Sequence, residues 1–420
     1  MQVNSEVIRA QFPSLQRNDV FFDNPGGTQI ARQSLERMQR YLLECNANHE
    51  GVFRTSQESD AVLHEARAAM ADLLNAGSPE SIVFGNNMTT ITFNMARALQ
   101  SRLGPGDEIV VTRLDHDANI SPWLLTAQDR GCKVTWVDFD VEEGTLRVDE
   151  FARAMERGPK LAAFGYASNA LGTINPVRRL TRMARDAGAV VYIDAVQYAP
   201  HGPIDVQELD CDFLVCSSYK FFGPHAAALY GRPEVLEEMK PYKVRPASNA
   251  APHKFETGTQ NHEGIAGILG AVEYLEWVGT QFGGSGDWSE RGYSGRRLTL
   301  KQAMTAIRSY EFELGRALIE AIESVPGTRI YGLTDTRRLE ERVPTVSFTL
   351  EGVEPRRLAE RLAQEGLYVW DGNYYALAVT ERLGLEGRGG MLRVGAVHYN
   401  TLEEIQRLQA ALNKIARSRA

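Results

Sequence analysis

Short runs of apolar and β-branched residues alternate with helical stretches from about residue 81 to residue 231. Seven of these runs are predicted strands, at residues 82–84, 108–112, 133–137, 161–166, 190–193, 213–216 and 226–230. Most are apolar throughout, which is typical of strands that are covered on both faces of a sheet. Because strands that alternate with helices form βαβ units, we expect an α/β fold with a mostly parallel seven-stranded sheet.

After residue 263 the apolar residues follow a helical periodicity that continues to about residue 323. One Gly/Ser-rich break at residues 283–286 interrupts it, and we expect this break on the surface. Strand candidates follow at 345–350, 368–370 and 392–395, with helices near 355–364 and 401–416. This predicts a smaller C-terminal α+β domain. Because 420 residues exceed one usual core, we expect an N-terminal segment (1–20) packed on the small domain, a large domain (21–265) and the small domain (266–420).

Composition and charge narrow the function classes. The chain is 43% hydrophobic and 24% charged, has a formal net charge of −8, and contains no run of Lys and Arg. A nucleic-acid or anionic-membrane partner is therefore not expected, and neither is a secretory signal or a membrane span. The four cysteines form no CxxC pair, which favours a reducing cytoplasm, and no metal site is predicted.

Two charged residues follow predicted strands and carry the first chemical signal. Lys220 stands between the apolar run 213–216 and a Phe-Phe-Gly-Pro segment. Burial there would lower its amine pKa, as a Schiff-base lysine requires, whereas a lone lysine is usually solvated. Asp194 ends the run 190–193, at the sheet edge where ligands bind. It is either a helix cap or the carboxylate that keeps the ring nitrogen of pyridoxal 5′-phosphate (PLP) protonated.

A third signal is the segment 85–90, Gly-Asn-Asn-Met-Thr-Thr, which joins a predicted strand to a helix. The free N–H groups at such a helix start suit a phosphate, and the hydroxyls of Thr89 and Thr90 add donors. Ordinary helix capping explains the same residues equally well.

Together these motifs resemble the cysteine desulfurase and selenocysteine lyase branch of fold-type I PLP enzymes, within the class V aminotransferases. The resemblance runs from Phe-Phe-Asp-Asn at 21–24 to His-Tyr-Asn-Thr at 398–401. It is strongest to the cysteine desulfurase-like subgroup, through segments 115–119, 168–173, 220–225 and 255–260.

The resemblance implies that Lys220 holds PLP, that His116 stacks on its ring, that Asp194 pairs with the ring nitrogen and that Gln197 bonds the phenolic oxygen. It also implies phosphate contacts from a group of hydroxyls, those of Thr90, Ser217, Tyr219 and, from a partner subunit, Thr259. A homodimer with shared active sites follows from the last of these. Family members carry histidine at the position of Tyr219, whose hydroxyl can still donate to phosphate.

Asn169 and Arg393 would face the carboxylate of a small amino-acid substrate, with Arg393 as a bidentate clamp. True desulfurases need a loop cysteine that takes sulfur as a persulfide. Here residues 371–376 read Asp-Gly-Asn-Tyr-Tyr-Ala, and the last cysteine of the chain is Cys216.

Three reactions need no cysteine: β-elimination or C–S lysis, release of sulfinate or selenium, and transamination. We expect a lyase that breaks a bond at the β-carbon first, transamination second, and a non-catalytic PLP-binding partner protein third. Tyr375 or Tyr374 would supply a proton to the leaving group, or both tyrosines merely pack. The candidate catalytic residues are therefore Lys220, His116 and Tyr375.

Overall fold

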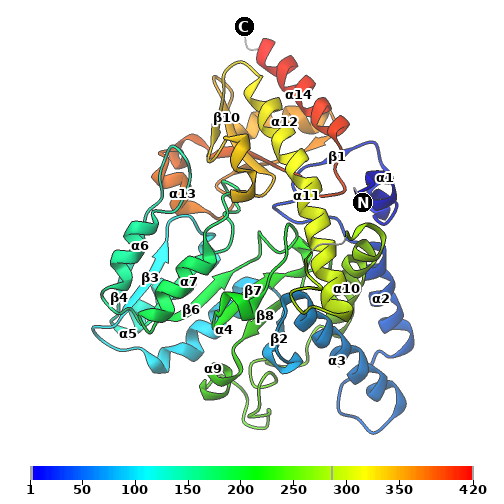
Figure 1. Cartoon of the computed structure of the whole chain (residues 1–420), viewed down its shortest axis with the longest axis vertical. Helices are drawn as coiled ribbons and strands as arrows, with labels where there is room; N and C mark the ends of the chain where they lie inside the picture. The colour runs from blue at the N-terminus through cyan, green and yellow to red at the C-terminus, as the bar shows by residue number, and fades with distance from the viewer. Residues whose placement is uncertain (1–2, 285–286, 419–420) are drawn as a thin grey trace.

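A seven-stranded sheet forms the centre of the larger part of the molecule (Figure 1). The structure is a computed structural model that describes residues 3–284 and 287–418. The sheet order is β2-β8-β7-β6-β5-β3-β4, and the strands are β2 (Ile82–Gly85), β3 (Glu108–Thr112), β4 (Lys133–Val137), β5 (Leu161–Gly165), β6 (Val190–Asp194), β7 (Phe213–Ser217) and β8 (Ala227–Gly231). Six of the strands run in one direction, and only β8 runs in the opposite direction. The predicted mostly parallel seven-stranded sheet is confirmed.

Helices cover both faces of this sheet. Because side chains alternate along a strand, Val110 points into the core under one set of helices and its neighbour Val111 into the core under the other. On the Val111 side lie α4 (Met88–Leu99) and α5 (Ser121–Arg130), and on the Val110 side lie α6 (Val148–Met155) and α7 (Val177–Asp186). Burial on two faces explains why the strands are apolar throughout.

Long helices gather at the β2 end of the sheet (Figure 1). There α10 (His262–Phe282) contacts three other helices, α2 (Arg32–Glu44), α3 (Arg54–Leu74) and α11 (Gly295–Glu323). The predicted helical periodicity thus forms α10 and α11. The Gly/Ser break between them lies partly outside the described residues. Short helices α1 (Ser5–Arg9), α8 (Val206–Leu209) and α9 (Pro233–Glu238) complete this part.

A smaller antiparallel sheet carries the C-terminal elements. Its order is β12-β13-β10-β9, with strands β9 (Thr328–Tyr331), β10 (Thr345–Leu350), β12 (Trp370–Gly372) and β13 (Met391–Gly395). Helices α12 (Pro355–Gln364), α13 (Leu377–Arg382) and α14 (Leu402–Arg417) belong to the same part. A capping box starts α14, because the Thr401 hydroxyl accepts from Glu404 N and the Glu404 carboxylate accepts from Thr401 N.

The predicted strand 368–370 is wrong as a single strand. The chain changes sheets at Val369: β11 (Leu367–Tyr368) pairs in parallel with β1 (Val20–Phe21), and β12 begins at Trp370 and pairs with β13. The short strand β1 was not predicted, and neither was β9. Both depend on partners that are distant in the chain, which a local pattern does not show.

The N-terminal segment contacts both parts of the molecule. Phe12 lies in the larger hydrophobic core, while Arg9 forms an ion pair of 2.7 Å with Glu404. Helix α11 also belongs to both cores, through Leu300 near its start and Leu318 near its end. The domain limits therefore stay a prediction.

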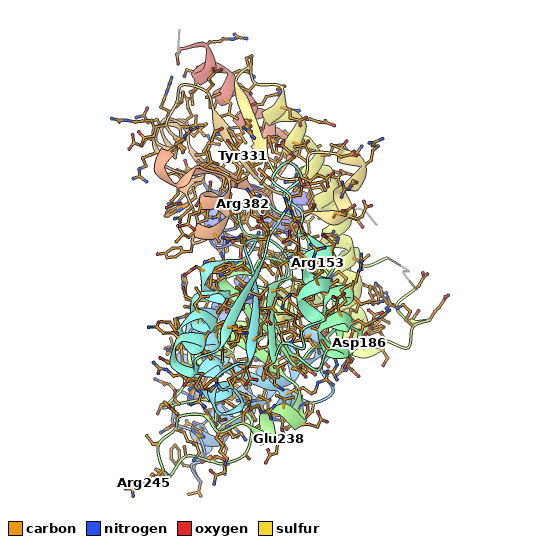
Figure 2. The ribbon with its side chains drawn as sticks, turned by 90° about the vertical axis from the view of Figure 1, so that its left-hand side faces the viewer. Arg153, Asp186, Glu238, Arg245, Tyr331 and Arg382 are labelled. Carbon is orange, nitrogen blue, oxygen red and sulfur yellow. The ribbon has the colours of Figure 1, made fainter. Side chains whose placement is uncertain are left out.

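Figure 2 shows Tyr331 and Arg382 in the upper, C-terminal part and Glu238 and Arg245 at the opposite end. The Arg382 guanidinium bridges the two parts through Asp138, at 2.8 Å. Among the described residues, none of the helices has the length and apolar character needed to cross a bilayer.

Candidate active site

A cavity of about 910 Å³ opens at the carboxyl ends of the parallel strands. Asp115 follows β3, Asn169 follows β5, Asp194 ends β6 and Lys220 follows β7, and all four line this cavity. Residues of the C-terminal part close its other side, namely Trp370, Tyr374, Tyr375 and Arg393. The parallel topology therefore brings together side chains that are far apart in the sequence, at the sheet edge where α/β proteins bind ligands.

Lys220 lies on the cavity floor at the end of a short 3-10 helix, Ser218–Lys220. Its Nζ donates to the carbonyl oxygens of Pro25 and Gly26, the latter at 3.0 Å. Burial, followed by the positive charge of Arg393, lowers its pKa to about 7, while Asp23 and Asp194 oppose this shift. A large share of the amine is thus neutral and nucleophilic near neutral pH.

Asp194 is buried, and its Oδ1 accepts a hydrogen bond of 2.9 Å from Val196 N. Burial raises its pKa to about 6, against the opposing effect of that hydrogen bond and of Lys220. Beside it, the buried Asp115 carboxyl accepts from the Thr112 hydroxyl at 2.9 Å. Burial holds the pKa of Asp115 well above its usual value, and the charge of Asp194 raises it further. Burial therefore raises the pKa of both neighbouring carboxyl groups.

Gly165 makes room for this pair. A Cβ atom at Gly165 would lie 2.3 Å from Asp115 Oδ1, so any other residue there would displace the carboxyl group. A similar constraint acts at Gly172, in the turn after Asn169, which has φ +78° and where a Cβ would lie 2.4 Å from the Thr345 carbonyl oxygen.

His116 is held as a neutral imidazole of one tautomer. Its Nδ1 accepts from Ala118 N at 3.0 Å, which leaves the proton on Nε2. Burial, then the charges of Lys220 and Arg393, lower its pKa to about 4. The Tyr375 ring stacks against it with centroids 5.7 Å apart and planes 23° apart.

Tyr374 and Tyr375 form the tip of a turn that carries them into the cavity. Both have left-handed backbone angles, φ 57° and 58°, and Ala376 N closes the turn on Asn373 O at 2.7 Å. Two consecutive non-glycine residues in this region store backbone strain, which is common at functional sites. Tyr374 is buried and its hydroxyl donates to Met391 O, whereas Tyr375 is 75% exposed.

Arg393 on β13 is buried and points at the same cavity. Its guanidinium donates to Asn169 O and to Asp23 Oδ1, each at 3.1 Å, and lies 4.3 Å from the centroid of the Tyr374 ring. Within the described residues, Arg393 Nε and Asn169 Oδ1 are buried atoms with no hydrogen-bond partner. A donor and an acceptor are thus unused at one end of the cavity.

The predicted phosphate-binding residues are only partly brought together. Thr89 and Tyr219 line the cavity, and Ser217 is buried next to it, with its Oγ accepting from Met88 N at 3.3 Å. Thr90 and Thr259 instead line a separate small groove, about 70 Å³, on the outer side of α4. Within one chain these two threonines therefore do not reach the cavity.

Gln197 also lines the cavity, where its Nε2 donates to Thr345 Oγ1 at 3.1 Å. Asp23, Asp115 and Trp370 are among the lining residues that were given no role from the sequence. The first two stand in motifs that the sequence analysis used, next to residues that did receive roles. Trp370 gave no local signal, since only the change of sheets at Val369 turns it to the cavity.

The chain is similar to known proteins in both sequence and fold. A profile of the aminotransferase class-V family matches residues 20–283 and 296–408. The chain belongs to this family. It is 33% identical to the aminotransferase-like protein FGM3 of Gibberella zeae over 98% of each chain, and 30% identical to a cysteine desulfurase of Pectobacterium atrosepticum, again over 98% of each.

The apo structure of cysteine desulfurase from Thermococcus onnurineus superposes on this chain with a TM-score of 0.88, covers the whole of both chains and is 27% identical. The fold is therefore the fold-type I α/β fold that the sequence predicts. As in the rest of the family, the cofactor is PLP, and the protein is a PLP-dependent enzyme.

The residues of the cavity fit this cofactor. PLP carries an aldehyde, a protonatable ring nitrogen and a flat ring. The cavity offers Lys220 with a pKa lowered to about 7, the buried carboxylate of Asp194 and the His116 imidazole in a fixed tautomer. The start of α4, with Met88 and Thr89 on the cavity wall, adds a helix N-terminus suited to phosphate.

Proposed function

We propose that this enzyme is a lyase that eliminates a leaving group from the β-carbon of a small amino acid, as in C–S bond cleavage, without a persulfide-forming cysteine. The observation that carries the proposal is the cavity lining, which among the described residues includes Tyr374 and Tyr375 but no cysteine. Burial raises the pKa of all four thiols. Only Cys132 is partly exposed, and its Sγ donates to Gly104 O at 3.4 Å.

Lys220 is proposed to hold PLP covalently, with His116 over the ring, Asp194 at the ring nitrogen and Gln197 at the phenolic oxygen. When bound, PLP supplies an electron sink that makes bonds at the substrate α-carbon labile. The neutral His116 can pack on a flat ring without adding a positive charge. The carboxylate of Asp194 has no salt-bridge partner among the described residues, which suits a cationic ring nitrogen.

The phosphate is proposed to lie at the start of α4, against Thr89, Ser217 and Tyr219. Thr90 and Thr259 share an exposed groove beside it. We infer that Thr259 reaches the phosphate of a second copy, so that the enzyme is a homodimer with shared active sites. Light scattering should give a dimer mass, and a fully active monomer would contradict the inference.

Binding of the substrate carboxylate is assigned to Arg393, whose Nε is an unused donor among the described residues. Arg393 is proposed to clamp the substrate carboxylate through its guanidinium, with Asn169 beside it. Lys220, whose pKa is lowered to about 7, is the base proposed for the α-proton. The Tyr375 hydroxyl would protonate the group that leaves the β-carbon. We keep the cytoplasm as the predicted location.

A class V aminotransferase is the second candidate, because the relative with 33% identity over 98% of each chain is named aminotransferase-like. Both reactions use the same base and the same carboxylate clamp. They differ in whether the bond at the β-carbon breaks.

The products separate the candidates. A lyase acting on an S-substituted cysteine consumes water and releases a thiol, pyruvate and ammonium without any amino acceptor. A transaminase instead needs a keto acid and makes a second amino acid, while a non-catalytic PLP-binding protein yields neither. PLP-loaded enzyme should be screened with L-cysteine, L-cysteine sulfinate, S-alkyl cysteines and L-alanine, with and without pyruvate or 2-oxoglutarate. Turnover that depends strictly on a keto acid would refute the lyase assignment.

A further inference from the structure

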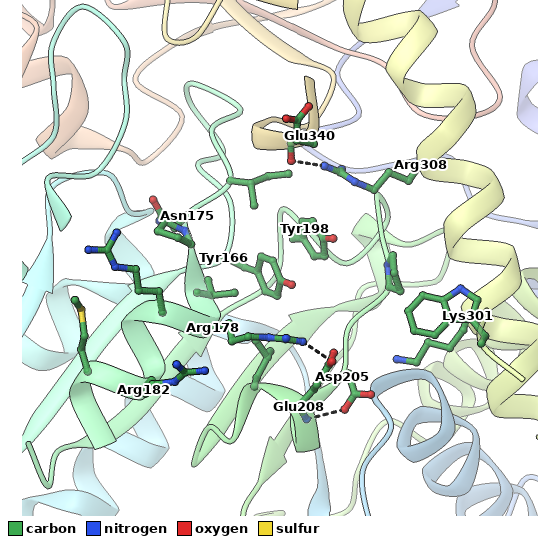
Figure 3. Close-up of a pocket in the computed structure, with 18 of the residues that line it drawn as sticks. Tyr166, Asn175, Arg178, Arg182, Tyr198, Asp205, Glu208, Lys301, Arg308 and Glu340 are labelled. Carbon is green, nitrogen blue, oxygen red and sulfur yellow. Dashed lines mark hydrogen bonds and ion pairs between the residues drawn. The ribbon is translucent and has the colours of Figure 1, made fainter. Parts of the chain in front are cut away.

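A second cavity, of about 760 Å³, lies on the opposite side of the large sheet from α4 and α5. Residues of α7, α8 and α11 and of the loops after β5 and β6 line it. Figure 3 shows these side chains converging on a central space between α7 and α11. None of the lining residues belongs to the PLP cavity, so this space is a separate feature of the enzyme.

One wall of the cavity is aromatic. The rings of Tyr166 and Tyr198 stack almost in parallel, with centroids 3.9 Å apart and planes 6° apart. In Figure 3 both hydroxyls point toward the α11 side of the cavity. Ile174, Val177 and Leu209 add apolar surface. The wall thus combines an apolar face with two polar hydroxyl groups.

The cavity is also lined by positively charged side chains that have no salt-bridge partner in the described part of the chain. Lys301, Arg308 and Arg182 line it, and within the described residues none of the three forms a salt bridge. Lys301 is buried and its Nζ donates to Ile204 O. Arg308 donates to the Glu340 carbonyl oxygen at 2.7 Å, and its guanidinium carbon lies 5.8 Å from the centroid of the Tyr198 ring.

Two lining carboxylates, those of the exposed Glu208 and the buried Asp205, already have partners. Glu208 Oε1 lies 2.5 Å from Arg178 and 2.8 Å from Arg291. Asp205 accepts from Glu208 N and from Asn75 Nδ2, each at 2.9 Å, and from the Tyr293 hydroxyl.

The other two lining carboxylates, those of Asp186 and Glu340, are exposed. In Figure 3 the Glu340 carboxylate lies on the side away from the two tyrosine rings. The guanidinium of Arg308 therefore faces the cavity without a salt bridge to any of the described lining carboxylates, although its charge also opposes the burial that raises the pKa of Glu311, which pairs with His201.

Nearby positive charges affect the pKa of the Tyr166 phenol. Burial and the neighbouring Tyr198 hydroxyl hold its pKa well above the usual value, while the charges of Arg308 and Arg178 lower it. Both arginines are thus close enough to stabilise negative charge near the Tyr166 hydroxyl. An anionic group placed there would gain charge-assisted hydrogen bonds in a partly desolvated space.

We propose that this second cavity binds a small organic anion. Its carboxylate or phosphate group accepts hydrogen bonds from Arg308 and from the Tyr166 and Tyr198 hydroxyls, and its apolar body lies against Ile174 and Val177. The site requires both parts of the ligand, because the charged groups and the apolar surface line one continuous space. The proposal is independent of the reaction assigned to the PLP cavity.

Calorimetric titration of the PLP-loaded enzyme tests the proposal with two probes, phenylacetate and phenyl phosphate, which distinguish carboxylate from phosphate. Acetate, inorganic phosphate and 2-phenylethanol each supply only half of the recognised chemistry. We expect at least one aromatic anion to bind one equivalent per chain, and each half-probe to bind more weakly by at least about tenfold.

Arg308→Gln should weaken binding of that probe by about tenfold to a hundredfold, because it removes a charge-assisted hydrogen bond. Arg308→Lys, which keeps the charge, should recover part of the affinity, and Tyr166→Phe should lose affinity with the charge intact. Arg316→Gln is the matched control, since Arg316 is exposed on the same helix and does not line the cavity.

Melting temperature and PLP content identify any variant that fails to fold, and Tyr166→Phe then carries the test. Equal affinity in Arg308→Gln, Tyr166→Phe and Arg316→Gln would overturn the proposal, because the probe would then sit elsewhere, for example at Arg393. Absence of binding for both aromatic anions up to about 10 mM would overturn it as well.

Discussion

Replacing Asp194 with asparagine removes one negative charge from a site that holds two buried carboxyl groups. The shape of the side chain is almost unchanged, and the acceptor for Val196 N is retained, which is a hydrogen bond of 2.9 Å in the native enzyme. What is lost is the anion that we assign to the ring nitrogen of PLP. The variant therefore tests charge rather than packing.

The size of the effect follows from burial. Asp194 is 7% exposed and has a pKa raised to about 6, so it is largely ionised above neutral pH. Removing one member of a buried ion pair costs about 3–5 kcal/mol. PLP affinity should thus fall by roughly two to four orders of magnitude. Lys220 also loses one of the two carboxylates that raise its pKa, so its pKa should fall below about 7.

Asp115→Asn is the matched control. Asp115 is 3% exposed in the same cavity, burial and the charge of Asp194 hold its pKa well above the usual value, and its carboxyl accepts from the Thr112 hydroxyl and is not assigned to PLP. An amide can replace the acceptor for the Thr112 hydroxyl, and PLP affinity should change by less than about threefold.

The assay is equilibrium dialysis of both apo variants against PLP, followed by absorbance of the bound cofactor and a melting curve without PLP. If Asp194→Asn binds PLP as tightly as Asp115→Asn does, the assignment of Asp194 to the ring nitrogen is refuted.

Four further outcomes are expected. The neutral amine of Lys220 is the form that captures PLP, so the rate of PLP uptake by the apoenzyme should rise with pH, with a midpoint near 7. Arg393→Gln should shift this midpoint upward, because it removes a positive charge that, together with burial, lowers the pKa of Lys220. A wild-type midpoint near 10 would contradict the burial argument. Borohydride should then fix the label on Lys220 and on no other lysine. Tyr375→Phe should lower kcat by about 10²- to 10⁴-fold, whereas Tyr374→Phe should chiefly lower stability, by about 1 kcal/mol for the bond to Met391 O; unchanged kinetics in both would leave the tyrosines as packing. Alkylation and mass spectrometry after incubation with L-cysteine should find no persulfide formed at the turnover rate on any of the four cysteines, and its detection would refute the reaction without a thiol.

The strands of the large sheet agree with the sequence prediction to within one residue at each end. This accuracy has a local cause, because a strand buried on both faces must be apolar at every position and a parallel sheet inserts a helix before the next strand. The same regularity made the candidate site residues predictable from the sequence. Asp194 and Lys220 were chosen as residues that follow such strands, and both line the PLP cavity.

The second domain was harder to predict from the sequence. Residues 368–370 look like one strand because their local pattern is uniform, yet the chain divides between two sheets there. The pairing of Leu367 with Val20 is a contact across most of the chain, and no local pattern encodes it. The same division turns Trp370 toward the cavity, so a lining residue was missed together with the strand.

The sequence by itself determined the fold class, the order of elements along the chain and the residue types at the carboxyl ends of the strands, since these depend on local periodicity and on which positions must be buried. Only the tertiary structure decided which charges share one space. It placed Arg393 beside Asp23 and Tyr375 over His116, left Thr90 and Thr259 in an outer groove, and opened a second cavity around Tyr166 and Arg308. The physical reason is that a pKa, an ion pair or a cavity depends on distances between residues that are remote in sequence, and only packing sets those distances.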